Sequence, residues 1–233
     1  MDTLSNVDTH RGENRPLTLD LSPSSSPVGQ CIQTGVSSEY VQKENHDWFV
    51  LRATYNRVEI AYKILASDHM QAYLPMCYTY KQNSNNKIKR KYEPLLPNVL
   101  FVYATAEQIN SYIKYHPTLS LFLRYFRDKT KPKMADEKHP PLIVRYNDMM
   151  NFIRITSINN EHIKVVEPEQ CHYKGGDIVQ ITDGNFKGIK GRVARVSGQQ
   201  RVIVEIEGLC LIATAYIPTA FISKINQNDR QTI

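Results

Sequence analysis

The stretch Gly176–Val196 reads GDIVQITDGNFKGIKGRVARV and decides the fold of the carboxyl-terminal third of the chain. Two apolar runs, Ile178–Ile181 and Val193–Val196, flank a segment with three glycines, which are Gly184, Gly188 and Gly191. Because glycine adopts positive φ without a steric penalty, this pattern predicts a strand, a tight reversal and a returning strand. The next stretch, Val202–Glu207, has a period of two, which predicts a half-buried strand and not a helix. Together these strands are typical of a small SH3-like barrel.

The length and composition allow one large domain or two modest ones. The chain has 233 residues, of which 41% are hydrophobic, so real cores can form. The longest apolar runs fall far short of the roughly 20 residues that a membrane span needs. Met1–Asp20 is polar and has no apolar signal core. We therefore expect a cytoplasmic protein with no membrane partner.

No motif for catalysis or metal binding stands out. The chain has no nucleophile elbow, no phosphate-binding glycine loop and no HExxH, so we expect no catalytic residues, no metal and no cofactor. The cysteines are too scattered for a CxxC motif or a disulfide framework, and the seven histidines show no ligand spacing. The four cysteines are Cys31, Cys77, Cys171 and Cys210.

The net charge of +6 is unevenly distributed. Residues 1–46 contain 3 basic and 6 acidic side chains, residues 47–155 contain 17 and 9, and residues 156–233 contain 9 and 8. The basic excess therefore lies in the middle segment. Such an excess favours nucleic acid or an acidic protein surface as a partner.

The amino-terminal half reads as an extension followed by mixed elements. Residues 1–46 are polar, contain LSPSSSPVG and predict a disordered extension. Order begins at Trp48, where WFVLRA predicts a buried strand, and the spacing of Val58, Ala61, Tyr62 and Leu65 predicts an amphipathic helix. A second strand is expected in QAYLPMCYTYK, a mobile polar loop in KQNSNNKIKRKYE, and a third strand in LPNVLFVYA.

A second helix and a fourth strand complete this domain. Thr105 and Gln108 form a capping-box signature, with Ile109, Tyr112 and Ile113 on the expected buried face. LSLFLRYF predicts a fourth strand, RDKTKPKMADEKHPPL a loop, and NDMMNFIRI a last short helix. The order of elements is that of a split βαβ domain with one antiparallel sheet.

These features together resemble the NusG family of transcription elongation factors. The domain opens on Trp48-Phe49-Val50, carries LPNVLFV at Leu96–Val102, and is followed by a glycine-turn segment that looks like a KOW motif. Within the family, the chain looks most like the UpxY-type antiterminators of capsular polysaccharide loci in Bacteroides-like bacteria. The strings behind this narrower likeness are WFVLRATYNR, PLLPNVLFVYA and FKGIKGRVARVSGQQRVIVEIEG.

The resemblance implies an α+β protein with two domains. The first is a NusG amino-terminal domain, a split βαβ unit with an antiparallel sheet and helices, and the second is a small SH3-like KOW β-barrel. The expected boundaries are an extension at 1–46, the NusG-like domain at 47–155, a linker at 156–172, the barrel at 173–227 and a tail at 228–233.

The resemblance also implies that the first domain binds RNA polymerase, closes its clamp and suppresses pausing and termination. The positions that match the docking site for the clamp helices of the polymerase β′ subunit are Val99 and Phe101, although relatives commonly carry an aromatic residue where Val99 stands. Alternation along the strand leaves open whether Phe101 faces a partner or the core. The positions that match the contact with the β-subunit gate loop are Asn110, Ser111 and Tyr112, where the usual histidine and two threonines are absent.

Basic residues suggest contact with upstream or nontemplate DNA, because lysine and arginine neutralise phosphates. An ordinary solvated loop is the alternative for each cluster, and Tyr55 between Arg52 and Arg57 offers a stacking ring as well. The candidate nucleic-acid residues are Arg52, Arg57, Lys87, Lys89, Arg90, Lys91, Arg124 and Arg127, and three lysines, Lys129, Lys131 and Lys133, follow the last two.

Four functions remain as hypotheses at this point. The first is operon-specific antitermination, favoured by Val99 and by QQRVIVEIEG, and the second is general elongation. The third is a ribosome-associated KOW protein that binds RNA, although the complete first domain counts against it. The fourth is an enzyme, which the missing motifs disfavour. The resemblance adds the ribosome or Rho as partners of the barrel.

Overall fold

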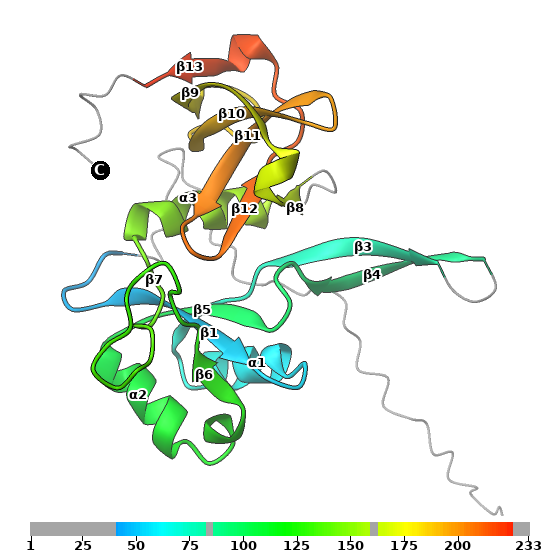
Figure 1. The fold of residues 1–233 in the computed structure, drawn as a ribbon. Coiled ribbons are helices and arrows are strands. Elements are labelled where there is room, and N and C mark those ends of the chain that lie inside the picture. Colours follow the sequence, from blue (N-terminus) through cyan, green and yellow to red (C-terminus); the bar gives the residue numbers. More distant parts are fainter. Residues whose placement is uncertain (1–40, 83–85, 159–162, 226–233) are drawn as a thin grey trace, which may run out of the picture.

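The computed structural model describes residues 41–82, 86–158 and 163–225. Most of the extension expected at residues 1–46 lies outside this part of the chain. The described elements form two antiparallel sheets with a helix between them, and a two-stranded ribbon projects from the side (Figure 1).

The first sheet is antiparallel throughout, as the sequence predicts. Its strand order is β2-β5-β1-β6, and β7 also pairs with β1. These strands are β1 (Asp47–Ala53), β2 (Gln71–Tyr73), β5 (Val99–Ala104), β6 (Leu123–Tyr125) and β7 (Ile143–Val144). The fourth strand is shorter than LSLFLRYF suggests, because a 3-10 turn, η1 (Leu119–Leu121), takes up its first half.

Two helices cover one face of this sheet. They are α1 (Val58–Ser67) and α2 (Ala106–Tyr115), and both confirm the sequence predictions. The spacing expected for α1 is observed, since Val58, Ala61 and Leu65 are all buried. The capping box at the start of α2 is present: the Gln108 N–H donates to Thr105 Oγ1, and the Thr105 N–H donates to Gln108 Oε1.

A third helix, α3 (Tyr146–Ser157), covers the other face. Strand alternation places on this face the side chains of Trp48, Val50, Val99, Phe101 and Tyr103. The rings of Phe101 and Phe152 lie 5.0 Å apart, and a 2.6 Å hydrogen bond joins Tyr73 Oη to Thr156 Oγ1. Met149, Phe152 and Ile155 of α3 are fully buried.

The second sheet has six antiparallel strands in the order β13-β9-β10-β11-β12-β8. They are β8 (Lys164–Val166), β9 (His172–Ile181), β10 (Lys190–Val196), β11 (Gln199–Ile206), β12 (Cys210–Ala213) and β13 (Ile222–Lys224), with two 3-10 turns, η2 (Pro168–Gln170) and η3 (Thr219–Phe221). The reversal predicted between residues 181 and 193 joins β9 to β10, and the strand predicted at Val202–Glu207 is β11.

The linker expected at residues 156–172 overlaps two regular elements of the structure. Its first residues finish α3, and β8 is part of the second sheet, where it pairs with β12. The pairing satisfies backbone groups that a linker would leave to water. The sequence shows no clear strand pattern here, because β8 is a short edge strand. Two of its three residues are exposed.

One core runs through both sheets. It extends from Trp48 and Phe101 through Phe152 to Val202, Val204 and Ile206 of β11. Figure 1 shows α3 between the two sheets, which agrees with this shared core. The domain boundary expected at residue 155 therefore falls inside a helix whose two sides are both packed.

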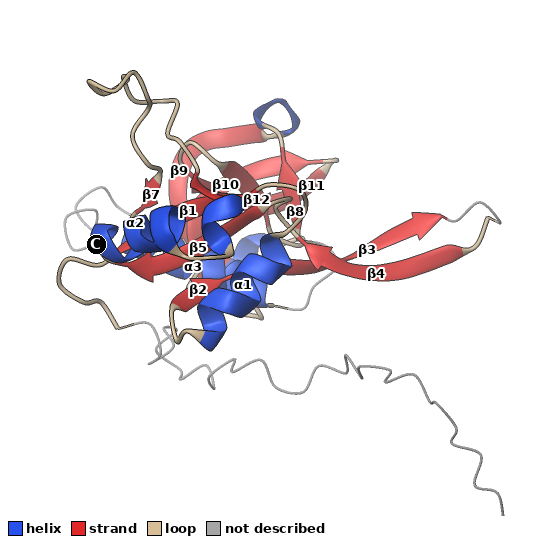
Figure 2. Ribbon diagram, turned by 90° about the horizontal axis from the view of Figure 1, so that it is seen from below, coloured by secondary structure: helices blue, strands red, loops and turns tan. Residues whose placement is uncertain are grey.

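The segment expected as a mobile polar loop is largely a β-ribbon. Strands β3 (Met76–Gln82) and β4 (Ile88–Pro94) pair only with each other in the described structure, and Figure 2 shows them extending away from the sheets. The second predicted strand, QAYLPMCYTYK, is thus two strands, β2 and β3, separated at Leu74 and Pro75. A proline is common where a strand begins or ends, because it has no N–H for the ladder.

Candidate nucleic-acid interface

The β3–β4 ribbon has two chemically different faces. In an antiparallel pair, residues directly opposite each other point to the same side. The register pairs Tyr78 with Tyr92 and Tyr80 with Arg90, and these residues with Ile88 make up the aromatic face. It also pairs Thr79 with Lys91 and Lys81 with Lys89, and these residues with Glu93 make up the lysine face.

A carboxylate lies among the cations of the lysine face. Glu93 Oε2 accepts hydrogen bonds from Lys81 Nζ at 3.0 Å and from Lys91 Nζ at 2.9 Å, and Thr79 Oγ1 donates to Glu93 Oε1 at 2.7 Å. The hydrogen bonds from Lys81, Lys91 and Thr79, in that order of importance, lower the pKa of Glu93 to about 2. Glu93 is therefore ionised at neutral pH and offsets part of the lysine charge, while Lys87 and Lys89 are exposed.

The aromatic face contains a small stack. The guanidinium carbon of Arg90 lies 3.6 Å from the centroid of the Tyr78 ring, which is a cation–π contact. The rings of Tyr78 and Tyr92 lie 4.8 Å apart. Tyr80 and Tyr92 are 54% and 55% exposed. This face combines positive charge with accessible rings, which is the combination that nucleic acids recognise.

A second basic and aromatic cluster lies at one end of the first sheet. Arg52 of β1 and Arg124 of β6 are cross-strand partners and are both exposed. Beyond β1, Tyr55 is 80% exposed in a turn with positive φ, and the Arg57 guanidinium lies 5.8 Å from its ring. The end cluster, defined as Arg52, Tyr55, Arg57 and Arg124, thus brings together residues separated by about seventy positions.

Arg127 does not join this cluster. Its Nη1 donates to the backbone oxygen of His139 at 2.9 Å, and its guanidinium lies 5.6 Å from the Tyr125 ring. Nearby, Lys131 Nζ lies 3.3 Å from Asp128 Oδ2. Arg127 therefore fastens the loop between β6 and β7. Arg124 of the end cluster is also tied to the backbone, since its Nη1 donates to the oxygens of Ser120 and Leu123 at 2.7 and 2.6 Å.

Val99 and Phe101 are not on the surface. Their exposed fractions are 7% and 0%, respectively. The Phe101 ring packs against Phe152 of α3. In this arrangement α3 covers the face of the sheet to which these two side chains point, so the docking role stays a prediction.

The residues matched to gate-loop contact lie in the middle and second half of α2. The helix begins at Ala106, so Asn110, Ser111 and Tyr112 are not at its start. Ser111 is exposed, and Asn110 Oδ1 accepts a hydrogen bond from Tyr125 Oη at 3.1 Å. Of the three side chains, Ser111 is therefore the most accessible to a partner.

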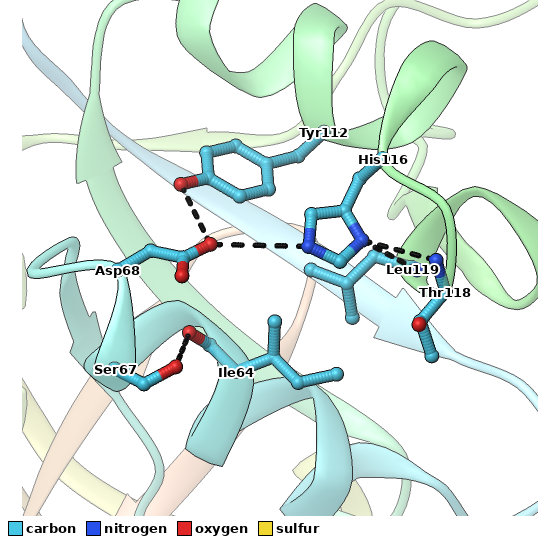
Figure 3. A network of polar contacts seen from close by, with 7 residues as sticks. All are labelled: Ile64, Ser67, Asp68, Tyr112, His116, Thr118 and Leu119. Carbon is cyan, nitrogen blue, oxygen red and sulfur yellow. Dashed lines mark hydrogen bonds and ion pairs between the residues drawn. The ribbon is translucent and has the colours of Figure 1, made fainter.

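Tyr112 is part of a polar network between two helices (Figure 3). Its hydroxyl donates to Asp68 Oδ2 at 3.1 Å, and its ring stacks on His116 with centroids 5.6 Å apart. His116 Nδ1 accepts the N–H groups of Thr118 and Leu119 at 3.1 and 3.0 Å, so the neutral ring carries its proton on Nε2. Burial, followed by the hydrogen bond to Asp68, raises the pKa of Tyr112. The network ties the end of α1 to the end of α2.

The three glycines of the opening stretch have two different roles. Gly184 and Gly188 lie in the turn between β9 and β10 with φ of 78° and 87°, as the sequence predicts. Gly191 is not a turn residue, because it lies in β10 opposite Val179. A Cβ at Gly191 would lie 2.3 Å from the Ile203 backbone oxygen, so glycine is needed there for the close approach of β11.

Sequence reasoning missed the aromatic half of the ribbon and the place of Arg124 beside Arg52. The signal for the ribbon was present, since residues 88–93 alternate in character across IKRKYE. The many basic residues of this segment led instead to the prediction of a polar loop. No local signal links Arg52 to Arg124, because their proximity depends on β1 pairing with β6.

Four results bear on class and family. In the described part of the chain, no helix is long and apolar enough to cross a membrane, and no three His, Cys, Asp or Glu side chains there are grouped so as to hold a metal ion.

Residues 46–139 match the NusG family model, described as transcription termination factor nusG. No curated protein matches the chain. The family consists of non-enzymatic transcription factors that bind RNA polymerase. The match covers about two fifths of the chain and supports a likeness of residues 46–139 to NusG-family proteins.

Proposed function

We propose that this protein is an operon-specific antiterminator that binds RNA polymerase, closes its clamp and suppresses pausing and termination at capsular polysaccharide loci. The observation that carries the proposal is the match of residues 46–139 to NusG. The narrower role rests on the likeness of WFVLRATYNR, PLLPNVLFVYA and the Gly176–Val196 region to UpxY-type proteins. The general NusG elongation factor is the alternative within the same class.

Two surfaces of the NusG domain suit DNA near the polymerase cleft. The exposed Lys87 and Lys89 of the ribbon and the Arg52–Arg124 pair of the end cluster supply positive charge, and Tyr55 supplies an exposed ring. Charge of this kind binds phosphates with little dependence on sequence. We assign these surfaces to the upstream or nontemplate DNA.

We propose clamp-helix docking at Val99 and Phe101 only for a conformation in which α3 no longer covers this face of the first sheet. Both side chains lie under α3 here, and α3 also packs against β11. Ser111, which is exposed on α2, is the proposed first contact with the gate loop, with Asn110 and Tyr112 beside it.

Residues 173–227 are proposed to act as a KOW barrel that couples the protein to the ribosome or to Rho. The support is the all-β content of the second sheet and the glycine turn at Gly184 and Gly188. The third hypothesis, a ribosome-associated KOW protein, is disfavoured because residues 46–139 match NusG.

The decisive test is single-round transcription through a terminator placed downstream of the leader of the protein's own operon. We expect the full chain to raise readthrough on this template and to have little effect on an unrelated leader. Equal readthrough on both templates would point to general elongation. No change on either template, with polymerase binding intact, would contradict antitermination itself.

Neutralising two ribbon lysines should weaken DNA contact selectively. In the Lys87→Gln/Lys89→Gln variant, binding to free polymerase is expected to stay unchanged, while binding to an assembled elongation complex becomes weaker. Each lost phosphate contact lowers the dependence of log K on log salt by about 0.9 for duplex DNA or about 0.7 for a single strand. The matched control is Lys138→Gln/Lys164→Gln, which removes the same charge at exposed positions elsewhere. Identical salt slopes for the two variants would show that the ribbon lysines do not contact DNA phosphates.

A further inference from the structure

The stability of the fold does not account for the exposed rings on the aromatic face of the ribbon. Large exposed aromatic side chains are unusual on a charged hairpin, yet Tyr80 and Tyr92 keep 54% and 55% of their surface accessible. A two-stranded ribbon gains little stability from exposed rings, because they bury little apolar area. The arrangement therefore calls for a ligand that uses the flat surfaces of the rings.

A cluster of planar groups includes one of these rings. Tyr78 contacts both the Arg90 guanidinium, 3.6 Å from its centroid, and the Tyr92 ring, 4.8 Å away and tilted by 43°. Arg90 stands directly opposite Tyr80 in the register, as Tyr92 does opposite Tyr78. The four residues thus form a block of planar groups on one side of the ribbon. Planar guanidinium and phenol groups both stack on nucleobases.

The lysine face has the larger net positive charge, since Lys81, Lys89 and Lys91 outnumber Glu93, but the aromatic face differs in carrying no carboxylate. Glu93 is the sole carboxylate in residues 76–82 and 88–94, and it points to the lysine face with Lys81 and Lys91. The aromatic face carries Arg90 and no acidic residue. A phosphate backbone that crosses the aromatic face therefore meets positive charge without a nearby carboxylate.

We propose that the aromatic face of the β3–β4 ribbon is a binding site for single-stranded nucleic acid, with bases stacked on Tyr80 and Tyr92 and held beside Arg90. A duplex suits this face less well, since its base planes are stacked on one another and only their edges are accessible in the grooves. The inference deepens the proposed DNA contact of the ribbon and rests on it. It adds the residues that stack and the strandedness of the ligand.

The test is fluorescence anisotropy of the full chain with three labelled probes: a dT12 oligonucleotide, an rU12 oligonucleotide and a 12-base-pair blunt duplex. We expect dT12 or rU12 to bind more tightly than the duplex. Tyr80→Ala and Tyr92→Ala should each weaken single-strand binding by about 5-fold to 100-fold, in the range typical of one stacked base. The salt slope should not change, because no charge is lost.

Two controls separate stacking from folding. Tyr80→Phe and Tyr92→Phe keep the ring and should retain binding, whereas Tyr115→Ala removes a tyrosine that is 78% exposed on α2 and should have no effect. Circular dichroism should show the same content of structure for all variants. The dT12 and rU12 arms distinguish DNA from RNA as the preferred strand.

Two results would overturn the proposal. One is that Tyr80→Ala and Tyr92→Ala both bind dT12 and rU12 with the affinity of the wild-type protein. The other is that the duplex binds as tightly as the single strands and that alanine substitution weakens the binding of all three probes equally. Either result can be told from a failure of the proposed function, because readthrough by the wild-type chain is measured separately and does not depend on these oligonucleotides.

Discussion

Phe101→Asp is expected to unfold the first sheet and the helices that pack on it, so that the variant is insoluble or lacks native structure. The Phe101 side chain is 0% exposed and packs against Phe152 of α3. A carboxylate at this position would be buried with no cation opposite it, and it would also leave much of the ring's volume empty. The expected loss is about 4–5 kcal/mol or more, which is most of the stability of an ordinary domain.

The measurement is urea unfolding followed by the fluorescence of Trp48, the single tryptophan of the chain. Trp48 is buried in the same core as Phe101 and therefore reports on it. The matched control is Leu121→Asp, which introduces the same charge at a side chain that is 67% exposed. Surface changes of this kind stay within about 0.5 kcal/mol.

The opposite result would be equally informative. If Phe101→Asp stays folded, with wild-type Trp48 fluorescence, and loses polymerase binding, then the face under α3 is open in solution. Phe101 would then be a docking anchor of the kind that the NusG resemblance implies. If Phe101→Asp fails to fold, the result does not exclude that Phe101 binds polymerase once α3 has moved. Phe101→Leu keeps an apolar side chain and is therefore the variant in which to measure polymerase binding.

Gly191→Ala is expected to destabilise the second sheet by about 3 kcal/mol. A Cβ at Gly191 would lie 2.3 Å from the Ile203 backbone oxygen and 2.7 Å from Val202 Cγ1. Neither neighbour is the far end of a flexible side chain, so the β10 and β11 backbones must move apart. Added bulk of this kind costs about 1–3 kcal/mol, and the backbone clash places this case at the upper end.

The measurement for Gly191→Ala is thermal unfolding followed by circular dichroism and by Trp48 fluorescence together. Because β11 shares a core with α3 and Trp48, both signals should shift to lower temperature. The matched control is Gly198→Ala, where a Cβ meets nothing within 4 Å and only the positive φ of 77° is unfavourable, which costs about 1 kcal/mol. Equal effects of the two substitutions would show that the close approach at Gly191 is relaxed in solution.

Elements with local sequence signals could be predicted from the residues alone. The period of Val58, Ala61 and Leu65 is that of a helix with one buried side, and it is α1. Thr105 and Gln108 marked the start of α2 three residues apart. The glycines and flanking apolar runs of residues 178–196 marked the reversal from β9 to β10. Each signal lies within one or two turns of chain, where backbone sterics and hydrogen bonding decide the outcome.

Which faces are covered and which residues meet depends on contacts between segments that are distant in the sequence. Alternation placed Val99 and Phe101 on one side of β5, but whether that side is wet depended on α3, some fifty residues away. Arg124 joined Arg52 because β6 pairs with β1, and Gly191 lost its apparent turn role because β11 approaches it. The ribbon lacked a hydrophobic run, so its strands became visible only through their pairing with each other. Periodicity reports the side of an element on which a residue lies; burial and contact depend on the distant segment that packs against that side.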